Sequence, residues 1–384
     1  MSRVDELIEE LCPDGVEYKP LSEIATITRG GSLQKKDFTE SGVPCIHYGQ
    51  IYTKYGLFTD KTLTFVSETT ALRQKKAVTG DIVMAVTSEN IEDVCKCVVW
   101  LGEEVVAVSG HTAIIHHNQD AKYLAYFFHS SMFFAQKQKL AHGTKVIEVT
   151  PDKLNGVIVP VPPLPVQREI VRILDNFTEL TAELTAELTT ELTARKKQYE
   201  YYRDKMLSFG TEIKMLSLAD VTNSIASGKN KERLDDGAYP VYGSTGIISY
   251  TNTPVYDWRQ ILVARVGANA GYINLADGQY DVSDNTLIVD VKKEHSLKYV
   301  YYQLQSMNLN QYTKGGGQPL ITAGELKKLS IPMPKRDVQN RIVSVLDNFD
   351  AICSDLNIGL PAEIEARQKQ YEYYRDKLLS FKEV

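Results

Sequence analysis

Residues 195–209 read RKKQYEYYRDKMLSF, and residues 367–381 read RQKQYEYYRDKLLSF. The two stretches end a longer repeat, in which residues 166–209 recur as residues 338–381 at a constant offset of 172 residues and without a gap. A repeat of this kind indicates that one structural unit is used twice. The chain therefore consists of two tandem halves that share a frame, and each half carries a different block in front of that frame.

The repeat has the hydrophobic period of a helix. Apolar residues recur every three or four positions, as one face of an α-helix requires. In the first copy they are Ile170, Leu174, Phe177, Leu180, Leu184, Leu188 and Leu192, and in the second they are Ile342, Leu346, Phe349, Ile352, Leu356, Leu360 and Ile364. A helix as long as this 44-residue repeat would measure about 66 Å. We therefore expect two long helices that bury each other as an antiparallel pair.

Part of the first copy is a four-residue repeat, because residues 178–193 read TELTAELTAELTTELT. Four residues turn a helix through about 400°, so successive leucines are displaced by about 40° and the apolar stripe winds around the helix. Glu191 is the one glutamate of this run with a base, Arg195, four residues later, and we expect the other glutamates to face solvent. The second copy contains Gly359-Leu360-Pro361, which we expect to kink or restart its helix.

A divergent block precedes each copy of the repeat and ends in prolines. The exits read IVPVPPLPVQ at residues 158–167 and SIPMPKRDVQ at residues 330–339, where proline favours extended backbone. We expect strands at 43–51, 81–86, 94–100 and 105–108 with a helix at 122–138, and strands at 239–242, 260–266, 271–275 and 285–291 with a helix at 297–304. The predicted fold class is α+β: two β-rich domains separated by two long antiparallel helices, arranged as a tandem pseudo-two-fold repeat.

Composition bounds the class of protein. The 384 residues with 43% hydrophobic content suffice for two or more cored domains. The sequence contains no run of 18 apolar residues and starts with a short charged amphipathic segment, so we expect neither a membrane span nor a secretory signal. Five cysteines without framework spacing fit a reducing compartment, and we expect a cytoplasmic protein.

The net charge of −6 at first argues against a nucleic-acid partner. The excess acid lies in the first eleven residues and in the two repeats, however. Residues 12–165 carry 15 basic and 16 acidic groups, and residues 210–337 carry 14 and 13. Each block is close to neutral, so a basic face is compatible with the composition.

No catalytic motif stands out in the sequence. Phosphate-binding loops, HExxH, zinc quartets and nucleophile-elbow spacing are all absent, and we expect a chain without catalytic residues and without a bound metal. Cys95 and Cys97 could form half of a metal site, but alternation along a strand explains the CxC spacing better. The pair His116-His117 at a strand end is interpreted as surface or core rather than as ligands.

Loops that contain glycine in both blocks also carry long basic and amide side chains. Lysine and arginine neutralise phosphates, whereas asparagine, glutamine and arginine form paired hydrogen bonds with base edges. The alternative is that these are ordinary hairpin residues. The candidate DNA-binding residues are Arg29, Lys35, Lys36, His47, Tyr48, Gln50, Tyr52, Lys54, Ser88, Asn90 and Lys145 in the first block, and Lys229, Lys231, Arg233, Tyr242, Ser244, Arg265, Asn269, Asp284, Asn285 and Gln318 in the second.

The proline exit, VQ-x-x-I-V-x-x-LDNF, the TAEL run and the ending KQYEYYRDK-x-LSF together resemble the specificity subunit of type I restriction–modification enzymes. The resemblance covers essentially the whole chain, and the TAEL run is similar to the subfamily in which such repeats vary in number (type IC-like). It implies an N-terminal helix at 1–11, target-recognition domains at 12–165 and 210–337, and conserved helical regions at 166–209 (with the TAEL repeats) and 338–384.

By this resemblance each recognition domain reads one half of a split double-stranded DNA site. The helical regions set the separation of the half-sites and dock two methylation subunits. Those partners would bind S-adenosylmethionine, and restriction subunits, reached through the complex, would use ATP and Mg²⁺; this chain would bind no cofactor. Candidate residues for helix packing and partner contact are Leu180, Leu184, Leu188, Leu192, Tyr199, Tyr202, Ile352, Leu356, Leu360, Ile364, Tyr371 and Tyr374.

Two other classes of protein stay open at this point. A stand-alone bipartite DNA-binding regulator would use the same two readers without a methylation partner. A coiled-coil assembly protein would explain the helices and leave the basic and amide loops without a role.

Overall fold

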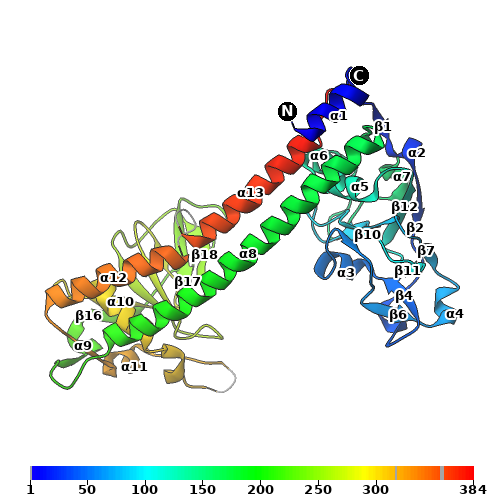
Figure 1. Ribbon diagram of the computed structural model, residues 1–384. Helices are drawn as coiled ribbons and strands as arrows, with labels where there is room; N and C mark the ends of the chain where they lie inside the picture. Colours follow the sequence, from blue (N-terminus) through cyan, green and yellow to red (C-terminus); the bar gives the residue numbers. More distant parts are fainter. Residues whose placement is uncertain (1, 316–317, 355–358) are drawn as a thin grey trace. The chain divides into compact units, whose positions relative to one another are not determined.

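The computed structural model describes residues 2–315, 318–354 and 359–384. The chain forms two compact units. Unit 1 comprises Met1–Ala186 and Glu365–Val384, and unit 2 comprises Glu187–Ile364. The helix α8, Leu164–Leu207, begins in unit 1 and ends in unit 2 (Figure 1). The prediction that the first repeat forms one unbroken helix is therefore confirmed.

The second repeat forms two helices, α12 (Arg336–Ser354) and α13 (Leu360–Leu378). Pro361 lies in the first turn of α13, where a missing N–H removes no helical hydrogen bond. The prediction that Gly359-Leu360-Pro361 restarts the helix is confirmed, while Leu356 lies outside the described residues. Within the described residues no helix is both long and apolar enough to cross a membrane.

Unit 1 holds the first divergent block. Its elements in chain order are α1 (Arg3–Leu11), β1 (Tyr18–Pro20), α2 (Leu21–Ile24), β2 (Ala25–Arg29), η1 (Lys35–Asp37), β3 (Phe38–Thr39), β4 (Val43–Ile46), α3 (Tyr48–Thr53), β5 (Phe58–Thr59), β6 (Thr64–Val66), α4 (Glu68–Ala71), β7 (Lys75–Ala77), β8 (Ile82–Ala85), β9 (Thr87–Ser88), β10 (Cys97–Trp100), β11 (Val106–Val108), β12 (Thr112–His117), α5 (Ala121–Phe128), α6 (Ser131–Leu140), β13 (Ile147–Glu148), α7 (Pro151–Leu154) and β14 (Ile158–Pro160). One sheet has the order β2-β12-β8-β10-β5, and another has the order β3-β6-β4-β11-β7. Short pairs join β1 to β14 and β9 to β13.

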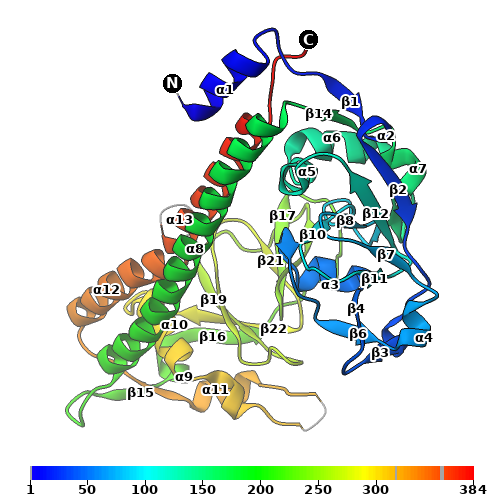
Figure 2. The same ribbon diagram turned by 45° about the vertical axis from the view of Figure 1, so that its right-hand side comes forward.

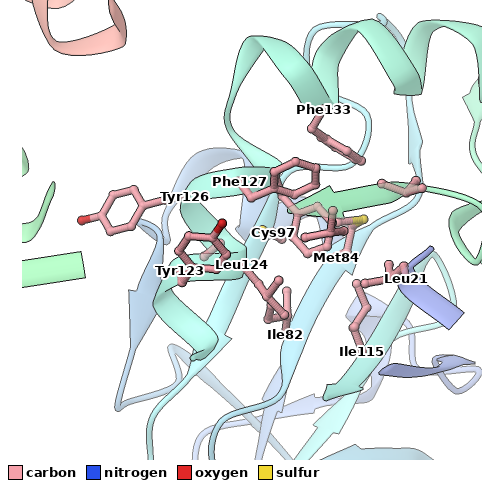
Figure 3. Packing of buried hydrophobic residues seen from close by; sticks show 14 of the residues in the cluster. Leu21, Ile82, Met84, Cys97, Ile115, Tyr123, Leu124, Tyr126, Phe127 and Phe133 are labelled. Carbon is pink, nitrogen blue, oxygen red and sulfur yellow. The ribbon is translucent and has the colours of Figure 1, made fainter. Parts of the chain in front are cut away.

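The inner strands β8 and β10 of the first sheet are buried on both faces, which explains their nearly continuous apolar sequence. Ile82 and Met84 of β8 pack under α5 and α6, against side chains such as Phe127 (Figure 3). Val83 and Ala85 alternate with them and face a separate core cluster. Burying a large apolar side chain contributes about 1.5–3 kcal/mol, so this two-sided packing makes the sheet a rigid support for the loops at its ends.

Unit 2 holds the second block. Its elements are β15 (Met215–Ser217), α9 (Leu218–Val221), β16 (Thr222–Ser227), β17 (Tyr239–Gly243), β18 (Gly246–Thr251), β19 (Gln260–Ala264), β20 (Ile273–Ala276), β21 (Asp281–Val282), β22 (Thr286–Val291), α10 (Leu297–Ser306), η2 (Leu309–Tyr312), α11 (Ala323–Lys328) and β23 (Ser330–Pro332). The sheets have the orders β16-β22-β19-β20 and β18-β17-β21, and β15 pairs with β23. The α+β class with two β-rich domains is thus confirmed.

Both domains are fastened to the proline exits in the same way. Tyr123 of α5 donates its hydroxyl hydrogen to the Pro160 carbonyl at 2.9 Å, and Tyr299 of α10 donates to the Pro332 carbonyl at 2.8 Å. The side-chain oxygen of Gln167 accepts the N–H of Asp120 at 3.0 Å. Gln339 accepts the N–H of Ser296 in the same manner at 2.9 Å. The two blocks have diverged in sequence, but they are attached to the proline exits and to the repeat by equivalent hydrogen bonds.

Three sequence predictions in the first block were wrong in their bounds. The strand expected at 43–51 ends at Ile46 and α3 follows, because the ring nitrogen Nδ1 of His47 accepts the N–H of Gly49 and caps a helix. The strand expected at 94–100 begins only at Cys97, since Cys95 has a φ of 67° that no strand residue adopts. The helix expected at 122–138 is divided into α5 and α6, because Ser130 caps a new helix.

The helices pack in antiparallel fashion within each unit. In unit 1 the hydroxyls of Thr178 and Tyr371 lie 3.0 Å apart, and the rings of Phe177 and Tyr374 are separated by 5.9 Å. In unit 2 the ring of Tyr202 stacks on that of Phe349 at 6.1 Å. A rising residue number on one helix thus meets a falling number on the other in unit 1, as predicted.

The apolar stripe of the repeats is less buried than predicted. Leu180 is 60% exposed and Ile352 is 49% exposed. Tyr202 and Tyr374 are also exposed, at 39% and 40%. The remaining described packing candidates are half-buried: Leu184, Leu188, Leu192, Tyr199, Leu360, Ile364 and Tyr371. The expectation that the two stripes bury each other was therefore wrong for Leu180 and Ile352, and also for Phe177, which is 36% exposed, because a stripe that winds about 40° per four residues turns away from its partner. The predicted ion pair of Glu191 with Arg195 is present at 3.3 Å.

Candidate nucleic-acid interface

Figure 2 shows β2, β12 and β8 of unit 1 beside one another, and backbone hydrogen bonds hold loops from four places in the sequence together at one end of these strands. The N–H of Gly30, after β2, donates to the carbonyl of Thr112 at 2.9 Å. The N–H of Val86, after β8, donates to the carbonyl of His111 at 3.0 Å, and the Val86 carbonyl accepts the N–H of Val149 at 3.0 Å. The loops that follow these strands are thereby held side by side. We call them the unit 1 loop cluster: residues 29–32, 86–95, 109–111 and 142–149.

Unit 2 builds the same arrangement from a different sequence. Gly228 donates its N–H to Thr286 at 3.0 Å, in the manner of Gly30. Arg265 donates its N–H to the carbonyl of Asn285 at 2.9 Å, and its own carbonyl accepts the N–H of Ile321 at 2.9 Å. Arg265 therefore stands where Val86 stands in unit 1. The unit 2 loop cluster comprises residues 228–233, 265–271, 283–285 and 314–315 with 318–320.

A glycine is required where each cluster begins. A Cβ atom on Gly30 would lie 2.0 Å from the carbonyl oxygen of Ser109. A Cβ atom on Gly228 would lie 2.2 Å from the carbonyl oxygen of Val282. The backbone of the first loop can approach the neighbouring loop this closely only without a side chain.

Several predicted residues of unit 1 are brought together around one hollow of about 390 Å³, which is lined by Tyr48, Tyr52, Ser88 and Asn90. The Tyr48 ring lies 4.9 Å from the ring of His111. His111 was not among the predicted residues, although it is exposed beside them. The hollow is also lined by the carboxylate of Glu89, a group that can accept a hydrogen bond from a base edge.

Other predicted residues of unit 1 use their side chains for hydrogen bonds or ion pairs with residues of the same chain. The Arg29 guanidinium donates to the Glu148 carboxylate at 2.8 Å. Burial and the nearby Lys35 charge lower the pKa of His47, whose neutral ring accepts the N–H of Gly49 at 3.1 Å. The carbonyl oxygen of the Gln50 side chain accepts the His47 N–H at 3.2 Å. These side chains shape the loops, and their contact with DNA stays a prediction.

Two further residues of this group are also internally bonded. The Tyr52 hydroxyl donates to the Thr87 carbonyl, and burial raises the pKa of this hydroxyl. The Asn90 amide donates to the Asp93 carboxylate at 2.9 Å. Tyr52 and Asn90 therefore hold the loop that follows β8. The basic residues Lys35, Lys36, Lys54 and Lys145 are exposed, and the structure gives none of them an ion pair with another described residue.

In unit 2 the structure brings Arg265, Asp284 and Asn285 together. The Arg265 guanidinium lies 3.5 Å from the Asp284 carbonyl, so only a weak contact holds it. Asp284 and Asn285 are exposed on the adjacent loop. Gln318 is exposed in a turn that pairs with Val266 through Leu320.

The remaining predicted residues of unit 2 lie around this group or apart from it. The Tyr242 carbonyl accepts the N–H of Ser283 at 2.9 Å, and Ser244 follows β17 directly. The Arg233 guanidinium donates to the Asn230 side chain at 3.0 Å, while Lys229 and Lys231 are exposed.

Asn269 lies apart from the Arg265 group. It lines a different hollow, of about 330 Å³, together with Arg203 and Asn308. This placement was not predicted, because the bend of the loop after Gly267 cannot be read from residue types alone.

Metal binding has little support in the described part of the chain. Among the described residues no group of three or more His, Cys, Asp or Glu side chains could hold a metal ion. Burial raises the pKa of the Cys95 thiol to about 12, so it stays protonated at neutral pH and is a poor ligand. Burial also raises the pKa of Cys97.

A second surface lies on the helices. In unit 1 an apolar hollow of about 210 Å³ between α8 and α13 is lined by Phe177, Leu180, Thr181, Leu184, Arg367, Gln370, Tyr371 and Tyr374. We call this surface the unit 1 helix groove. At the offset of 172 residues, unit 2 carries the same residue types at Phe349, Arg195, Gln198, Tyr199 and Tyr202, with Ile352 in place of Leu180. Most of the residue types that line the unit 1 helix groove therefore recur at the corresponding positions of unit 2.

The sequence matches the family described as "Type I restriction modification DNA specificity domain" over residues 13–194 and 210–366. It is 30% identical over 375 residues to the Type I restriction enzyme EcoprrI specificity subunit of Escherichia coli, with 89% of each chain covered. It is 36% identical over 251 residues to the EcoR124I/EcoR124II specificity subunit of the same species, covering 57% of this chain and 60% of that one.

Solved structures share the fold at low sequence identity. A chain from a structure concerned with complex assembly and conformational transition of the type I R-M system has a TM-score of 0.70 at 17% identity, covering 96% of this chain and 98% of that one. The HsdS subunit from Thermoanaerobacter tengcongensis has a TM-score of 0.55 at 16% identity, covering 97% of this chain and 98% of that one.

Proposed function

Because the chain belongs to the type I restriction modification DNA specificity family, we propose that it is the non-catalytic recognition subunit of such a complex. Each loop cluster reads one half of a bipartite site in double-stranded DNA. The recognition domains are assigned to residues 12–165 and 210–337, and the conserved helical regions to 166–209 and 338–384. The chain works in the cytoplasm, where the DNA is.

One observation carries this proposal: a single chain builds the same loop cluster twice on equivalent backbone hydrogen bonds, and fills it with different side chains. Unit 1 presents His111 and, beside it, Tyr48 from the adjoining helix α3, and unit 2 presents Arg265, Asp284 and Asn285. Arginine reads guanine and asparagine reads adenine by paired hydrogen bonds in the major groove, whereas an aspartate accepts from cytosine. A shared backbone with different reading groups is suited to two dissimilar half-sites.

The helices supply the partner surfaces. The unit 1 helix groove and its counterpart around Tyr202 and Phe349 each dock one methylation subunit, which gives two methylation subunits per chain. Exposed Leu180 and Ile352 support this assignment, because apolar side chains that the chain does not bury itself are available to a partner. Restriction subunits join through that complex. The partners bind S-adenosylmethionine, ATP and Mg²⁺, and this chain binds none of them.

The TAEL run assigns the chain to the subfamily in which the number of these repeats sets the unread spacer between half-sites. Support comes from the unbroken helix α8, which carries the whole run without a kink. An unbroken helix transmits both the rise and the rotation of each added repeat. The spacer is therefore a property of α8 and not of the loop clusters.

Methylome sequencing of a host that carries the complete gene set tests the proposal. The expected result is a bipartite methylated motif with an unread spacer, which disappears when this gene alone is deleted. Co-purification with methylation subunits separates this function from that of a stand-alone regulator. A chain that binds DNA specifically without any methylation partner, or a deletion that leaves the methylome unchanged, would contradict the proposal.

A further inference from the structure

We propose that a basic surface of unit 1, formed by Lys35, Lys36, Arg73, Lys75 and Lys76, binds the phosphate backbone of DNA beside the half-site that unit 1 reads. We call these five residues the basic surface. The inference rests on the proposed function and adds to it a contact with DNA that does not depend on the base sequence. Arg73, Lys75 and Lys76 were not predicted from the sequence as DNA-binding residues.

The chemistry of the surface is that of an anion site. Lys36 and Arg73 line one hollow of about 370 Å³, and the hydroxyl-bearing residues Ser32, Thr69 and Thr70 line it with them. Cationic and hydroxyl groups are the donors with which proteins hold phosphate oxygens. The carboxylate in the lining, Asp37, already accepts the backbone N–H of Gln34 at 2.8 Å. Asp37 thus caps η1, and Lys36 and Arg73 outnumber its single negative charge in the lining.

The basic surface adjoins the unit 1 loop cluster. Gly31 lies in the first loop of that cluster and donates its N–H to the carbonyl of Val108 at 2.9 Å. Val108 of β11 is paired directly with Lys75 of β7. Lys35 lies close enough to His47 for its charge to help lower the pKa of that ring. Lys75 is therefore joined through β11 to the first loop of the cluster. Lys76, the next residue of the strand, points to the opposite face of the sheet, the face of Ala107 and of Ala71 in α4, so the basic surface extends around the edge strand β7.

All five cations are available to a ligand. Each is exposed, and none forms an ion pair with another residue in the described ranges 2–315, 318–354 and 359–384. Other basic side chains of unit 1 are engaged instead, as Arg29 is with Glu148 at 2.8 Å and Lys122 is with Asp175 at 2.7 Å. Five unpaired cations on one domain favour a polyanion as the ligand.

A different explanation covers only part of the surface. β7 is the edge strand of its sheet, and lysines on an edge strand prevent pairing with the edge of another molecule. This accounts for Lys75 and Lys76. It does not account for Arg73 and Lys36, which lie outside β7 and share a hollow lined with hydroxyl-bearing residues.

The test uses the chain reconstituted with its methylation subunits and duplex DNA that contains the methylated motif. Two double variants, Lys36→Gln with Arg73→Gln and Lys75→Gln with Lys76→Gln, are compared with the control Lys139→Gln with Lys382→Gln. The control removes two exposed lysines of unit 1 that also lack an ion pair among the described residues. Affinity is measured for cognate and for unrelated DNA across a salt series.

Each lost phosphate contact is expected to reduce the slope of log K against log salt by about 0.9. Both test variants should lose affinity equally on cognate and unrelated DNA and keep the methylated motif, while the control keeps the wild-type slope. An unchanged slope would overturn the inference, as would a change in the motif, which would make these residues base readers. Self-association of the Lys75/Lys76 variant with an unchanged slope would identify edge protection instead.

Different outcomes would contradict the proposed function and the basic surface. Wild-type complex that binds no duplex DNA specifically would overturn it and the inference together. Wild-type complex that binds its motif, with variants that keep the wild-type slope, would overturn the basic surface alone.

Discussion

Asp175 and Asp347, which lie 172 residues apart, accept the same pair of hydrogen bonds in their respective units. Asp175 accepts the hydroxyl of Tyr126 at 2.8 Å and the ammonium of Lys122 at 2.7 Å. Asp347 accepts the hydroxyl of Tyr302 at 2.6 Å together with a lysine ammonium at the same distance. Each aspartate therefore fastens the first helix after the strands of its domain to the helix of the repeat.

Replacing Asp347 by Ala should lower the free energy of unfolding by about 2 kcal/mol, because hydrogen bonds to a charged group contribute about 1.5–3 kcal/mol and buried Tyr302 is left without its acceptor. Denaturant unfolding of the complex checks the value. Asn348→Ala is the matched control, since Asn348 is exposed on the next position of the same helix. Equal effects of the two substitutions would show that Asp347 does not fasten the domain.

The helical part of the fold could be predicted from the sequence because the 44-residue repeat occurs twice in it. The unbroken α8 and the restart at Leu360 follow from periodicity and from Pro361. The exposure of Leu180 could not be predicted from the periodicity, because a periodic stripe indicates that one face of a helix is apolar without saying which segment covers that face. The helix α3 was also missed, since its cap is the ring nitrogen of His47, a residue that is not a usual helix cap.

Part of the predicted set of DNA-binding residues lies together in the structure, as Arg265, Asp284 and Asn285 do. That these residues contact DNA stays a prediction. The sequence could not predict which side chains bond to other residues of the chain, because such partners can be distant in sequence. Arg29, for example, pairs with Glu148, 119 residues away. Likewise Lys75 becomes part of the basic surface only through strand pairing.

Arg265→Ala should relax the half-site read by unit 2 and leave the other half-site unchanged. An arginine that pairs with a guanine contributes about 1–3 kcal/mol of discrimination, and the guanidinium is held here only by a 3.5 Å contact. Methylome sequencing of the variant checks which positions become degenerate. Equal weakening on every DNA sequence would instead make Arg265 a phosphate contact. Arg259, which pairs with Asp277, is the control arginine.

Tyr374→Ala and Tyr202→Ala should each release one methylation subunit, and the double variant should release both. A tyrosine at the centre of an interface often contributes 2 kcal/mol or more, which corresponds to about 30-fold in affinity. Native mass spectrometry of the reconstituted complex measures the stoichiometry. Tyr373→Ala is the matched control, because Tyr373 is 62% exposed and does not line the helix groove. Loss of both subunits from one single variant would contradict two independent docking surfaces.

Unit 1 should be destabilised by acid through His129. Burial lowers the pKa of this ring from 6.5 to about 4. The unfolded chain therefore binds a proton below pH 6.5 that the folded chain takes up only near pH 4, and stability falls as the pH falls between these values. The full effect is about 3 kcal/mol, because one pKa unit corresponds to about 1.36 kcal/mol.

The equivalent position in unit 2 is Gln305, so His129→Gln is a substitution that the shared frame already accommodates. Thermal unfolding between pH 7 and pH 4 should show a smaller acid loss in this variant than in the wild type. An unchanged pH profile would show that other groups cause the acid sensitivity.

Deletion of Thr181–Leu184 should shorten the unread spacer by about one base pair and leave both half-sites unchanged. Four residues contribute about 6 Å of helix and about 40° of rotation, and one base pair rotates DNA by about 34–36°, since a turn holds about 10–10.5 pairs. The deletion brings Thr185 and Leu188 into the register of Thr181 and Leu184, so the unit 1 helix groove keeps the same residue types.

Methylome sequencing of the deletion variant measures the spacer directly. Thr181→Ala is the control, because it changes the same repeat without changing the length of α8. The loop clusters of both units are untouched by the deletion, so the bases that they read should stay the same. A motif with altered half-sites and the original spacer would show that α8 does not set the separation.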